Sequence, residues 1–294
     1  MLSNLRSFFR KHLWLRKFIA YSLAPSGMFD SYFKNYKPSP YWEKRIADVL
    51  SCKDNEAIPR VGNAGAIING KQVMHNGLKV NLGSYYGPES AKMLMLSKGV
   101  HEPQEERLFM EVLKQMPQGA VMVELGAFWS FYSMWFNKEI KNAVNIMVEP
   151  DSFNIGQGQR NFKLNGMKGK FIETFIGKEY NETANVITID KLVQDNQIGH
   201  IDILHSDIQG YEYDMLLGAT DTMMGNKIGY FFISTHSNEV HYKCLDLLTA
   251  KKYFIIVSID LDETFSEDGL IVARDNNLKG INIIPVHKKS KNEF

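Results

Sequence analysis

The sequence predicts an α/β fold, in which a doubly wound, mostly parallel sheet follows a smaller N-terminal region of helices and short strands. From residue 120 onward, short apolar segments alternate with helical segments, the pattern of parallel strands joined by right-handed crossovers. Before residue 100, prolines and glycines interrupt the chain at Pro38, Pro40 and 61–70. We therefore expect an N-terminal helical and entry subdomain over 1–100 and the sheet domain over 101–294.

The elements of the larger domain follow from their apolar patterns. Residues 102–116 predict an amphipathic helix with Pro103 in its first turn, and Glu102, Glu105 and Glu106 there suit the positive end of a helix dipole. The predicted strands are 120–125, 145–148, 170–176, 201–206, 230–235 and 253–259, with a last pair at 269–274 and 280–286. The aromatic residues between 128 and 136 are expected to be mostly core.

Composition limits the function classes. The chain has 294 residues, of which 44% are hydrophobic, so it can bury a full core. Its formal charge of +1 gives no general field for nucleic acid, which makes a nucleic-acid partner unlikely on charge grounds. Cys52 and Cys244 lie far apart in no metal-binding spacing, as expected for a reducing compartment such as the cytoplasm.

The first 29 residues contain five basic side chains and no acidic one. Their longest uncharged stretch is too short to cross a bilayer, which needs about 20 residues. A basic amphipathic helix that touches anionic lipid at the inner membrane face is one interpretation, and a helix packed on the rest of the protein is the other.

Polar residues end the predicted strands. Glu124, Glu149, Asp207 and His236 each stand at or just after the end of a strand. In a doubly wound sheet the ligand lies beyond these carboxyl ends. Gly126 permits a tight turn and close approach of a ligand, and an acid about twenty residues further on is suited to hydrogen-bond both hydroxyls of a ribose. Taken alone, Glu124 could be a helix cap and Glu149 a solvated loop acid.

The turn after the first of these strands lacks both common phosphate-binding patterns. It reads Gly126, Ala127, Phe128, Trp129, Ser130, which is neither GxGxxG nor GxxxxGK[ST]. S-adenosylmethionine fits such a turn better than a dinucleotide does. We expect its methionine tail to meet Ser133 and the backbone of the turn, and its sulfonium to lie near aromatic faces.

Five segments then resemble, in order, the landmarks of the FkbM-type S-adenosylmethionine-dependent methyltransferases over roughly residues 100–275. They are VELGAFWSFYS, VEPDSFNIGQGQRNFKLNG, VITIDKLV, IDILHSDIQGYEYDMLLGA and GYFFISTHS. The resemblance implies a seven-stranded class I methyltransferase sheet whose last strand is antiparallel, and O-methylation of a sugar or polyketide hydroxyl.

The resemblance also implies where the cofactor lies. It places Glu124 and Gly126 near the methionine portion, Glu149 on the ribose, and the loop of the 170s near adenine. We also expect four further residues to contact the cofactor: Ala127, Ser130, Pro150 and Asp207. The chain departs from the family pattern at Ser130, where a glycine is usual, and at Gln209, where many members carry an acid.

Methyl transfer is an in-line displacement in which the acceptor oxygen must lose a proton, so a general base is expected. His236 is the first candidate because histidine titrates near neutral pH, and Asp207 is the second. His205 lies deeper on its strand and is expected to be structural. Mg²⁺ bound by Asp207, Glu212, His236 and Asp190 remains an alternative, but no compact metal spacing is present, so no metal ligand is assigned.

These observations predict an S-adenosylmethionine-dependent O-methyltransferase that acts on a hydroxyl of a sugar or glycoconjugate. Two alternatives stay open: a nicotinamide-dependent oxidoreductase and a noncatalytic nucleoside-binding module. The sequence does not indicate an oligomeric state.

Overall fold

The computed structural model describes residues 26–290 and divides into two compact units. The N-terminal unit comprises the described part of Met1–Ala47 together with Pro59–His101, and the C-terminal unit comprises Asp48–Ile58 and the described part of Glu102–Phe294. Of the basic segment 1–29, only its last four residues are described. No helix among residues 26–290 has the length and apolarity required to span a bilayer.

The N-terminal unit is built around a small antiparallel sheet. Its strands β1 (Ile67–Ile68), β2 (Lys71–Val73) and β3 (Lys79–Asn81) pair in that order. The helices α3 (Asp30–Lys34) and α5 (Pro88–Leu96) belong to this unit, and α4 (Pro40–Ser51) spans the boundary between the units at Ala47 and Asp48. The Asp30 carboxylate accepts the Gly70 amide at 2.9 Å, which ties α3 to the turn between β1 and β2.

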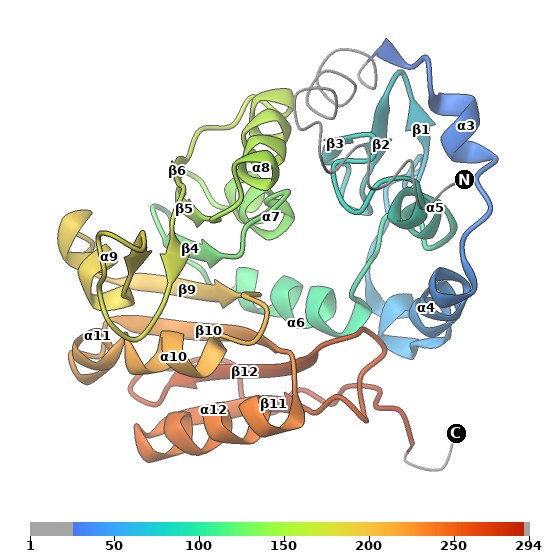
Figure 1. Ribbon diagram of the computed structural model, residues 1–294. Coiled ribbons are helices and arrows are strands. Elements are labelled where there is room, and N and C mark those ends of the chain that lie inside the picture. The colour runs from blue at the N-terminus through green and yellow to red at the C-terminus, as the bar shows by residue number, and fades with distance from the viewer. Residues whose placement is uncertain (1–25, 291–294) are drawn as a thin grey trace. The chain divides into compact units, whose positions relative to one another are not determined.

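The C-terminal unit is a seven-stranded sheet with helices around it (Figure 1). Its strand order is β11-β12-β10-β9-β4-β5-β6, and only β12 runs antiparallel to its neighbours. The strands are β4 (Val121–Leu125), β5 (Val144–Val148), β6 (Lys170–Ile172), β9 (Ile201–Ser206), β10 (Ile228–Thr235), β11 (Tyr253–Ile259) and β12 (Gly269–Asp275). The helices are η3 (Lys53–Ala57), α6 (Pro103–Leu113), α7 (Phe131–Glu139), α8 (Ser152–Leu164), α9 (Ile189–Asp195), α10 (Glu212–Leu217), α11 (Thr220–Met224) and α12 (Asn238–Ala250).

The α/β class and the mostly parallel sheet are confirmed, as is the antiparallel last strand. Two predicted strands differ from the structure. The segment 170–176 divides into β6 and a separate strand β7 (Phe175–Ile176), which pairs with β8 (Val186–Ile187) outside the main sheet. Residues 280–286 form no strand, so β12 is the last strand of the sheet, and it lies between β10 and β11.

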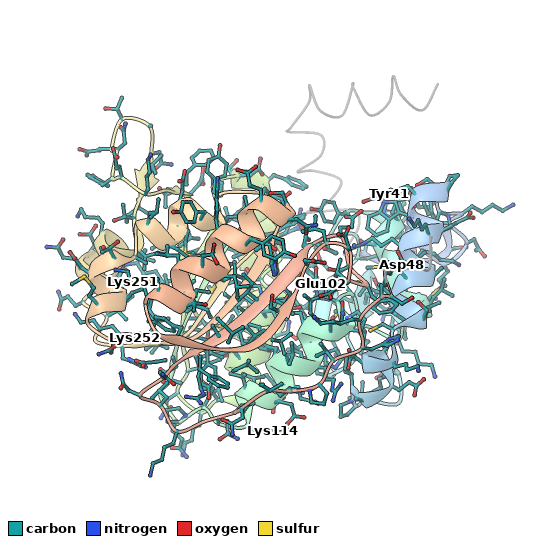
Figure 2. All side chains as sticks on the ribbon, turned by 90° about the horizontal axis from the view of Figure 1, so that it is seen from below. Tyr41, Asp48, Glu102, Lys114, Lys251 and Lys252 are labelled. Carbon is teal, nitrogen blue, oxygen red and sulfur yellow. The ribbon has the colours of Figure 1, made fainter. Side chains whose placement is uncertain are left out.

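Helix α6 carries opposite charges at its two ends. Glu102 is the N-cap residue and Lys114 the C-cap residue (Figure 2). Pro103 occupies the first turn, and the apolar stripe Leu108, Phe109, Val112 and Leu113 is buried. This order of charges suits the helix dipole, as the sequence indicated.

The register of the sheet brings several strand ends to one edge. Leu125 of β4 pairs with Val148 of β5 and with Ser206 of β9, so these three strands end together. At β4 the strand order changes direction, which makes this edge the switch point of the sheet. Because β12 is antiparallel and Thr235 pairs with Gly269, the residue before β12 lies at the same edge as the residue after β10.

Candidate functional site

The turn after β4 is fixed by backbone contacts. The amides of Gly126 and Ala127 both donate to the carbonyl of Val148, at 2.9 and 3.0 Å. Gly126 has a φ of +71°, and a Cβ there would lie 1.7 Å from the carbonyl oxygen of Asp207. Glycine is therefore required at 126 by the chain itself, since any side chain would collide with the end of β9.

The remainder of the turn stores backbone strain. Phe128 has a φ of +37° and Ser130 a φ of +60°, which is the left-handed region that glycine tolerates best. The Phe128 carbonyl accepts the amide of Gly158 on α8 at 3.2 Å, and a Cβ at Gly158 would lie 2.2 Å from the Ser130 hydroxyl. Close contact with α8 thus holds the turn in this conformation.

Glu124, at the end of β4, caps helix α7. Its buried carboxylate accepts the amide of Ser133 at 3.1 Å, and Ser133 is itself fully buried. The carbonyl of Ser133 accepts the side-chain amide of Asn145 on β5 at 3.0 Å. Burial raises the pKa of Glu124 from 4.5 to about 7, although His205 and Ser133 oppose the shift. Glu124 therefore has a structural role in capping, independent of any ligand.

Glu149 connects the end of β5 to the turn. One of its carboxylate oxygens accepts the Phe128 amide at 3.2 Å and the other accepts the Asp151 amide at 3.0 Å. Pro150 stands between Glu149 and Asp151, the N-cap residue of α8, and it is partly buried. Burial raises the pKa of Glu149, and the two amide contacts moderate the rise. The structure thus places Glu149 directly beside the Gly126 turn.

A cluster of buried polar side chains connects β9, β10 and helix α6. His205 of β9 contacts Glu105 of α6, with 2.6 Å between Nε2 and Oε1, and the other oxygen of Glu105 accepts the Ser234 hydroxyl at 3.1 Å. Burial opposes charge on His205, but the Glu105 carboxylate outweighs this and raises its pKa. The Tyr132 hydroxyl donates to Glu102 at 3.0 Å. His205 is buried, in agreement with the structural role expected for it.

His236 is surrounded by carboxylates. Its Nδ1 lies 2.8 Å from Glu212, and its Nε2 lies 3.3 Å from an oxygen of Asp207 and 3.3 Å from an oxygen of Asp268. Burial disfavours the imidazolium, but the hydrogen bonds to Asp207 and Glu212 and the charge of Asp268 raise its pKa to about 10. The three carboxylates thus favour the protonated form of His236 over the neutral form that a general base requires.

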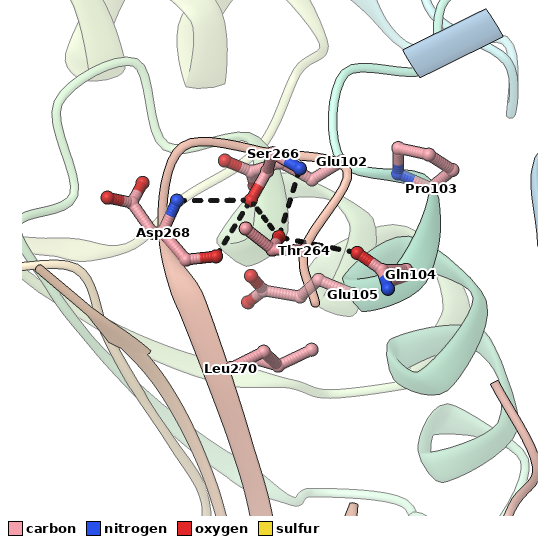
Figure 3. Close-up of a pocket in the computed structure, with 8 residues that line it drawn as sticks. All are labelled: Glu102, Pro103, Gln104, Glu105, Thr264, Ser266, Asp268 and Leu270. Carbon is pink, nitrogen blue, oxygen red and sulfur yellow. Dashed lines mark hydrogen bonds between the residues drawn. The ribbon is translucent and has the colours of Figure 1, made fainter. Parts of the chain in front are cut away.

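The loop between β11 and β12 fixes Asp268. Its backbone amide donates to the Ser266 hydroxyl at 3.3 Å, and that hydroxyl donates to the Asp268 carbonyl at 3.0 Å (Figure 3). Figure 3 shows the Asp268 carboxylate pointing away from Thr264 and Gln104. The loop and the first turn of α6 enclose a small cavity of about 10 Å³, with Glu105 in its lining, which leaves room for about one water molecule.

The predicted site residues form two groups at one edge of the sheet. Glu124, Gly126, Ala127, Ser130, Ser133, Glu149 and Pro150 belong to the turn and to the strand and helix ends around it, and Asp207 and His236 form the second group. Gly126 joins the groups through its contact with the backbone of Asp207.

Asp190 lies elsewhere, because its carboxylate accepts the amides of Asp221 and Thr222 at the start of α11. Thr188, two residues earlier, caps α9 by accepting the Lys191 amide at 3.0 Å. The segment VITIDKLV thus supplies two helix caps, Thr188 and Asp190, and Asp190 is not one of the acids around His236.

Sequence reasoning missed Asp268 and interpreted Glu105 as a capping charge. Asp268 could have been found from its position directly before the predicted strand 269–274. That strand is antiparallel, so it begins at the edge of the sheet where the parallel strand β10 ends. The partner of Glu105, a histidine 100 residues away, had no local signal.

Comparisons with known proteins give a family for part of the chain. Residues 117–253 match the model of the methyltransferase FkbM domain. No curated protein matches the chain significantly. Among solved structures, precorrin-6y C5,15-methyltransferase from Geobacter metallireducens GS-15 is similar, with 12% identity, a TM-score of 0.41, and coverage of 57% of this chain and 88% of that one.

Two further solved structures are similar to the same extent. TrmK from M. capricolum, in complex with S-adenosylhomocysteine, has 14% identity and a TM-score of 0.41 and covers 58% of this chain and 71% of that one. The ribosomal protein L11 methylase from Lactobacillus delbrueckii subsp. bulgaricus has 14% identity and a TM-score of 0.39, with coverage of 61% and 82%.

Proposed function

Because residues 117–253 form a methyltransferase FkbM domain and the chain is an S-adenosylmethionine-dependent methyltransferase, we propose that it methylates a hydroxyl of a sugar or glycoconjugate. The observation that carries this proposal is the contact between Gly126 and Asp207. It joins the turn after β4 to Asp207 and His236 at one edge of the sheet.

The cofactor is assigned to the turn between β4 and α7. Glu149 takes the ribose hydroxyls, with Pro150 beside it, and the loop of the 170s faces adenine. Gly126, Ala127 and Ser130 form the wall along the methionine portion, and Glu124 and Ser133 stand behind that wall. The buried carboxylates there favour the ammonium and sulfonium charges of the cofactor over the phosphates of a nicotinamide dinucleotide.

The acceptor hydroxyl is assigned to the space in front of Asp207. The Asp207 side chain is 35% exposed, so an alcohol can reach it, whereas the His236 ring is 17% exposed and contacts carboxylates at both nitrogens. We assign proton removal to this pair, with Asp207 as the acceptor of the proton and His236 as the group that holds Asp207 in place. A positioned base contributes about a hundredfold or more to such a step.

The carboxylates of Asp207 and Asp268 also favour an acceptor that is rich in hydroxyl groups. Sugar hydroxyls donate hydrogen bonds to carboxylates, and Asp207 and Asp268 both lie at this edge. The phosphates of a nucleic acid would instead be repelled by them. We place the enzyme in the cytoplasm, with the basic segment 1–29 in peripheral contact with the inner membrane face.

The test is incubation with labelled S-adenosylmethionine and a panel of nucleotide sugars, lipid-linked glycans and finished glycans, read by mass. The proposal predicts a gain of one methyl group on one of these acceptors and a loss of at least a hundredfold in Asp207→Asn. The control is Asp246→Asn, which removes the same charge from an exposed position on α12 and should leave the rate unchanged. Methylation of only protein or nucleic acid would refute the acceptor class.

A further inference from the structure

The groups around His236 have the geometry of a metal site. Asp207, His236 and Asp268 each offer one ligand atom, and these atoms lie within 4.8 Å of one another. Nε2 of His236 is 3.3 Å from each of the two carboxylate oxygens. Two ligand atoms that bind one divalent ion at about 2.0–2.4 Å and at right angles lie about 2.8–3.4 Å apart. The three atoms can therefore share an ion after small movements.

The fold fixes these three side chains from three adjacent strands. Asp207 follows β9 and His236 follows β10, and Asp268 precedes β12. The pair of Thr235 with Gly269 sets His236 opposite Asp268, and a Cβ at Gly269 would lie 2.6 Å from the Thr235 hydroxyl. The glycine therefore allows β12 to come close enough for Asp268 to reach the histidine.

Glu212 supplies a second and independent observation. Its side chain is fully buried at the start of α10, and one oxygen lies 2.8 Å from Nδ1 of His236. Its other oxygen is buried and has no hydrogen-bond partner among residues 26–290. When a carboxylate accepts a hydrogen bond from Nδ1 of a histidine, it fixes the orientation of the ring and makes Nε2 a stronger metal ligand.

The side-chain amide of Gln209 also lies beside Asp207 and His236. Its backbone is left-handed, with a φ of +56°, and its side-chain nitrogen lies 2.8 Å from Nε2 of His236 and 3.0 Å from Asp207. The two ends of an amide are exchanged by a half-turn of the group, which would direct the oxygen at this space. Within residues 26–290 no lysine or arginine forms an ion pair with Asp207 or Glu212, so no side-chain cation competes there with a bound metal ion.

We propose that Asp207, His236 and Asp268 bind one divalent cation, with Gln209 as a further oxygen ligand and Glu212 as the carboxylate that orients His236. Two carboxylates with one imidazole suit Mn²⁺ or Mg²⁺, with Mn²⁺ preferred because of the nitrogen ligand. Such an ion has further positions open. A hydroxyl oxygen bound at one of them would pass its proton more readily to the second carboxylate oxygen of Asp207, the one that does not bind the ion. The role in methyl transfer rests on the proposed function, whereas ion binding does not.

The test is titration of the full chain with MnCl₂ at neutral pH, followed by the electron paramagnetic resonance of free Mn²⁺, with competition by MgCl₂. The wild-type chain should bind one Mn²⁺. Asp268→Asn and His236→Gln should bind it at least tenfold more weakly, and Glu212→Gln should lose tenfold to a hundredfold. Circular dichroism identifies a variant that fails to fold, and Asp268, on a partly exposed loop, is the variant expected to fold normally.

The matched control is Glu239→Gln, which removes an exposed acid paired with Lys243 on α12 and should bind Mn²⁺ as the wild type does. No binding of Mn²⁺ by the wild type at millimolar concentration would overturn the proposal, and the group would then be a salt bridge around a protonated histidine. Equal binding by all variants would place the ion elsewhere and would also overturn it. Calorimetry with S-adenosylmethionine in the presence of chelator separates the two proposals, because failure there contradicts the methyltransferase site alone.

Discussion

Gly126 lies directly against the backbone carbonyl of Asp207, so closely that a Cβ would be 1.7 Å from its oxygen. The glycine directly follows β4, and the aspartate directly follows β9, the strand beside it. The turn assigned to the cofactor is therefore in direct backbone contact with the aspartate assigned to the acceptor.

Gly126→Ala is expected to destabilise the protein severely. The new methyl group must displace the end of β9, and the alanine would also have to keep a φ of +71°. We expect a loss of about 3 kcal/mol or more in the free energy of unfolding, measured with urea. Gly199→Ala is the control, since nothing lies within 4 Å of a Cβ at that position. Equal stability of the two variants would show that the Asp207 carbonyl is not in close contact with Gly126.

Ser130→Gly is expected to stabilise the protein by about 1 kcal/mol. Ser130 has a φ of +60° and its side chain makes no capping hydrogen bond to α7, so removal of the side chain relieves strain at little loss. Ser130→Ala is the matched control, because alanine keeps the strain and removes only the hydroxyl. The urea midpoint of each variant measures the effect. If the urea midpoint of Ser130→Gly were lower than that of Ser130→Ala, residue 130 would not have the left-handed backbone conformation described here.

Glu124 should make stability depend on pH. Its pKa is raised in the folded protein from 4.5 to about 7, so the folded state holds the proton more tightly than the unfolded state does. This contribution is fully present below about pH 4.5 and is lost as the pH rises through about 7, to a total of about 3 kcal/mol.

Glu124→Gln isolates that contribution, because glutamine can still accept the Ser133 amide but does not titrate in this range. The difference in unfolding free energy between the variant and the wild type should grow between about pH 4.5 and 7 and then stay constant. Parallel curves over that interval would show that the Glu124 carboxyl ionises normally in the folded protein.

Much of the fold follows from local pattern. The strands at 201–206 and 253–259 and the helix that begins at Pro103 could be predicted because each is a periodic apolar run with clear ends. The segment 280–286 shows the limit of this approach. It has a similar apolar character but joins no strand of the sheet, because strand pairing depends on contacts distant in sequence, which a local pattern does not contain.

The site could be predicted only in part, and for the same reason. Residues at the ends of parallel strands, such as Glu149 and Asp207, were found because topology alone brings them together. The reason for Gly126 differs from expectation, since the chain itself, rather than a ligand, already requires a glycine there. The environment of His236 was beyond local pattern, because Glu212 and Asp268 reach it from separate elements and change its charge.

The most direct test of the central claim is calorimetric titration of S-adenosylhomocysteine into the wild type and Glu149→Ala. The account predicts one binding site per chain, no binding of a nicotinamide dinucleotide, and a loss of about 1–3 kcal/mol in Glu149→Ala as hydrogen bonds to a charged group disappear. Asp246→Asn, which removes an exposed acid on α12, should bind as the wild type does. Unchanged affinity in Glu149→Ala, or binding of the dinucleotide in place of S-adenosylhomocysteine, would contradict the account.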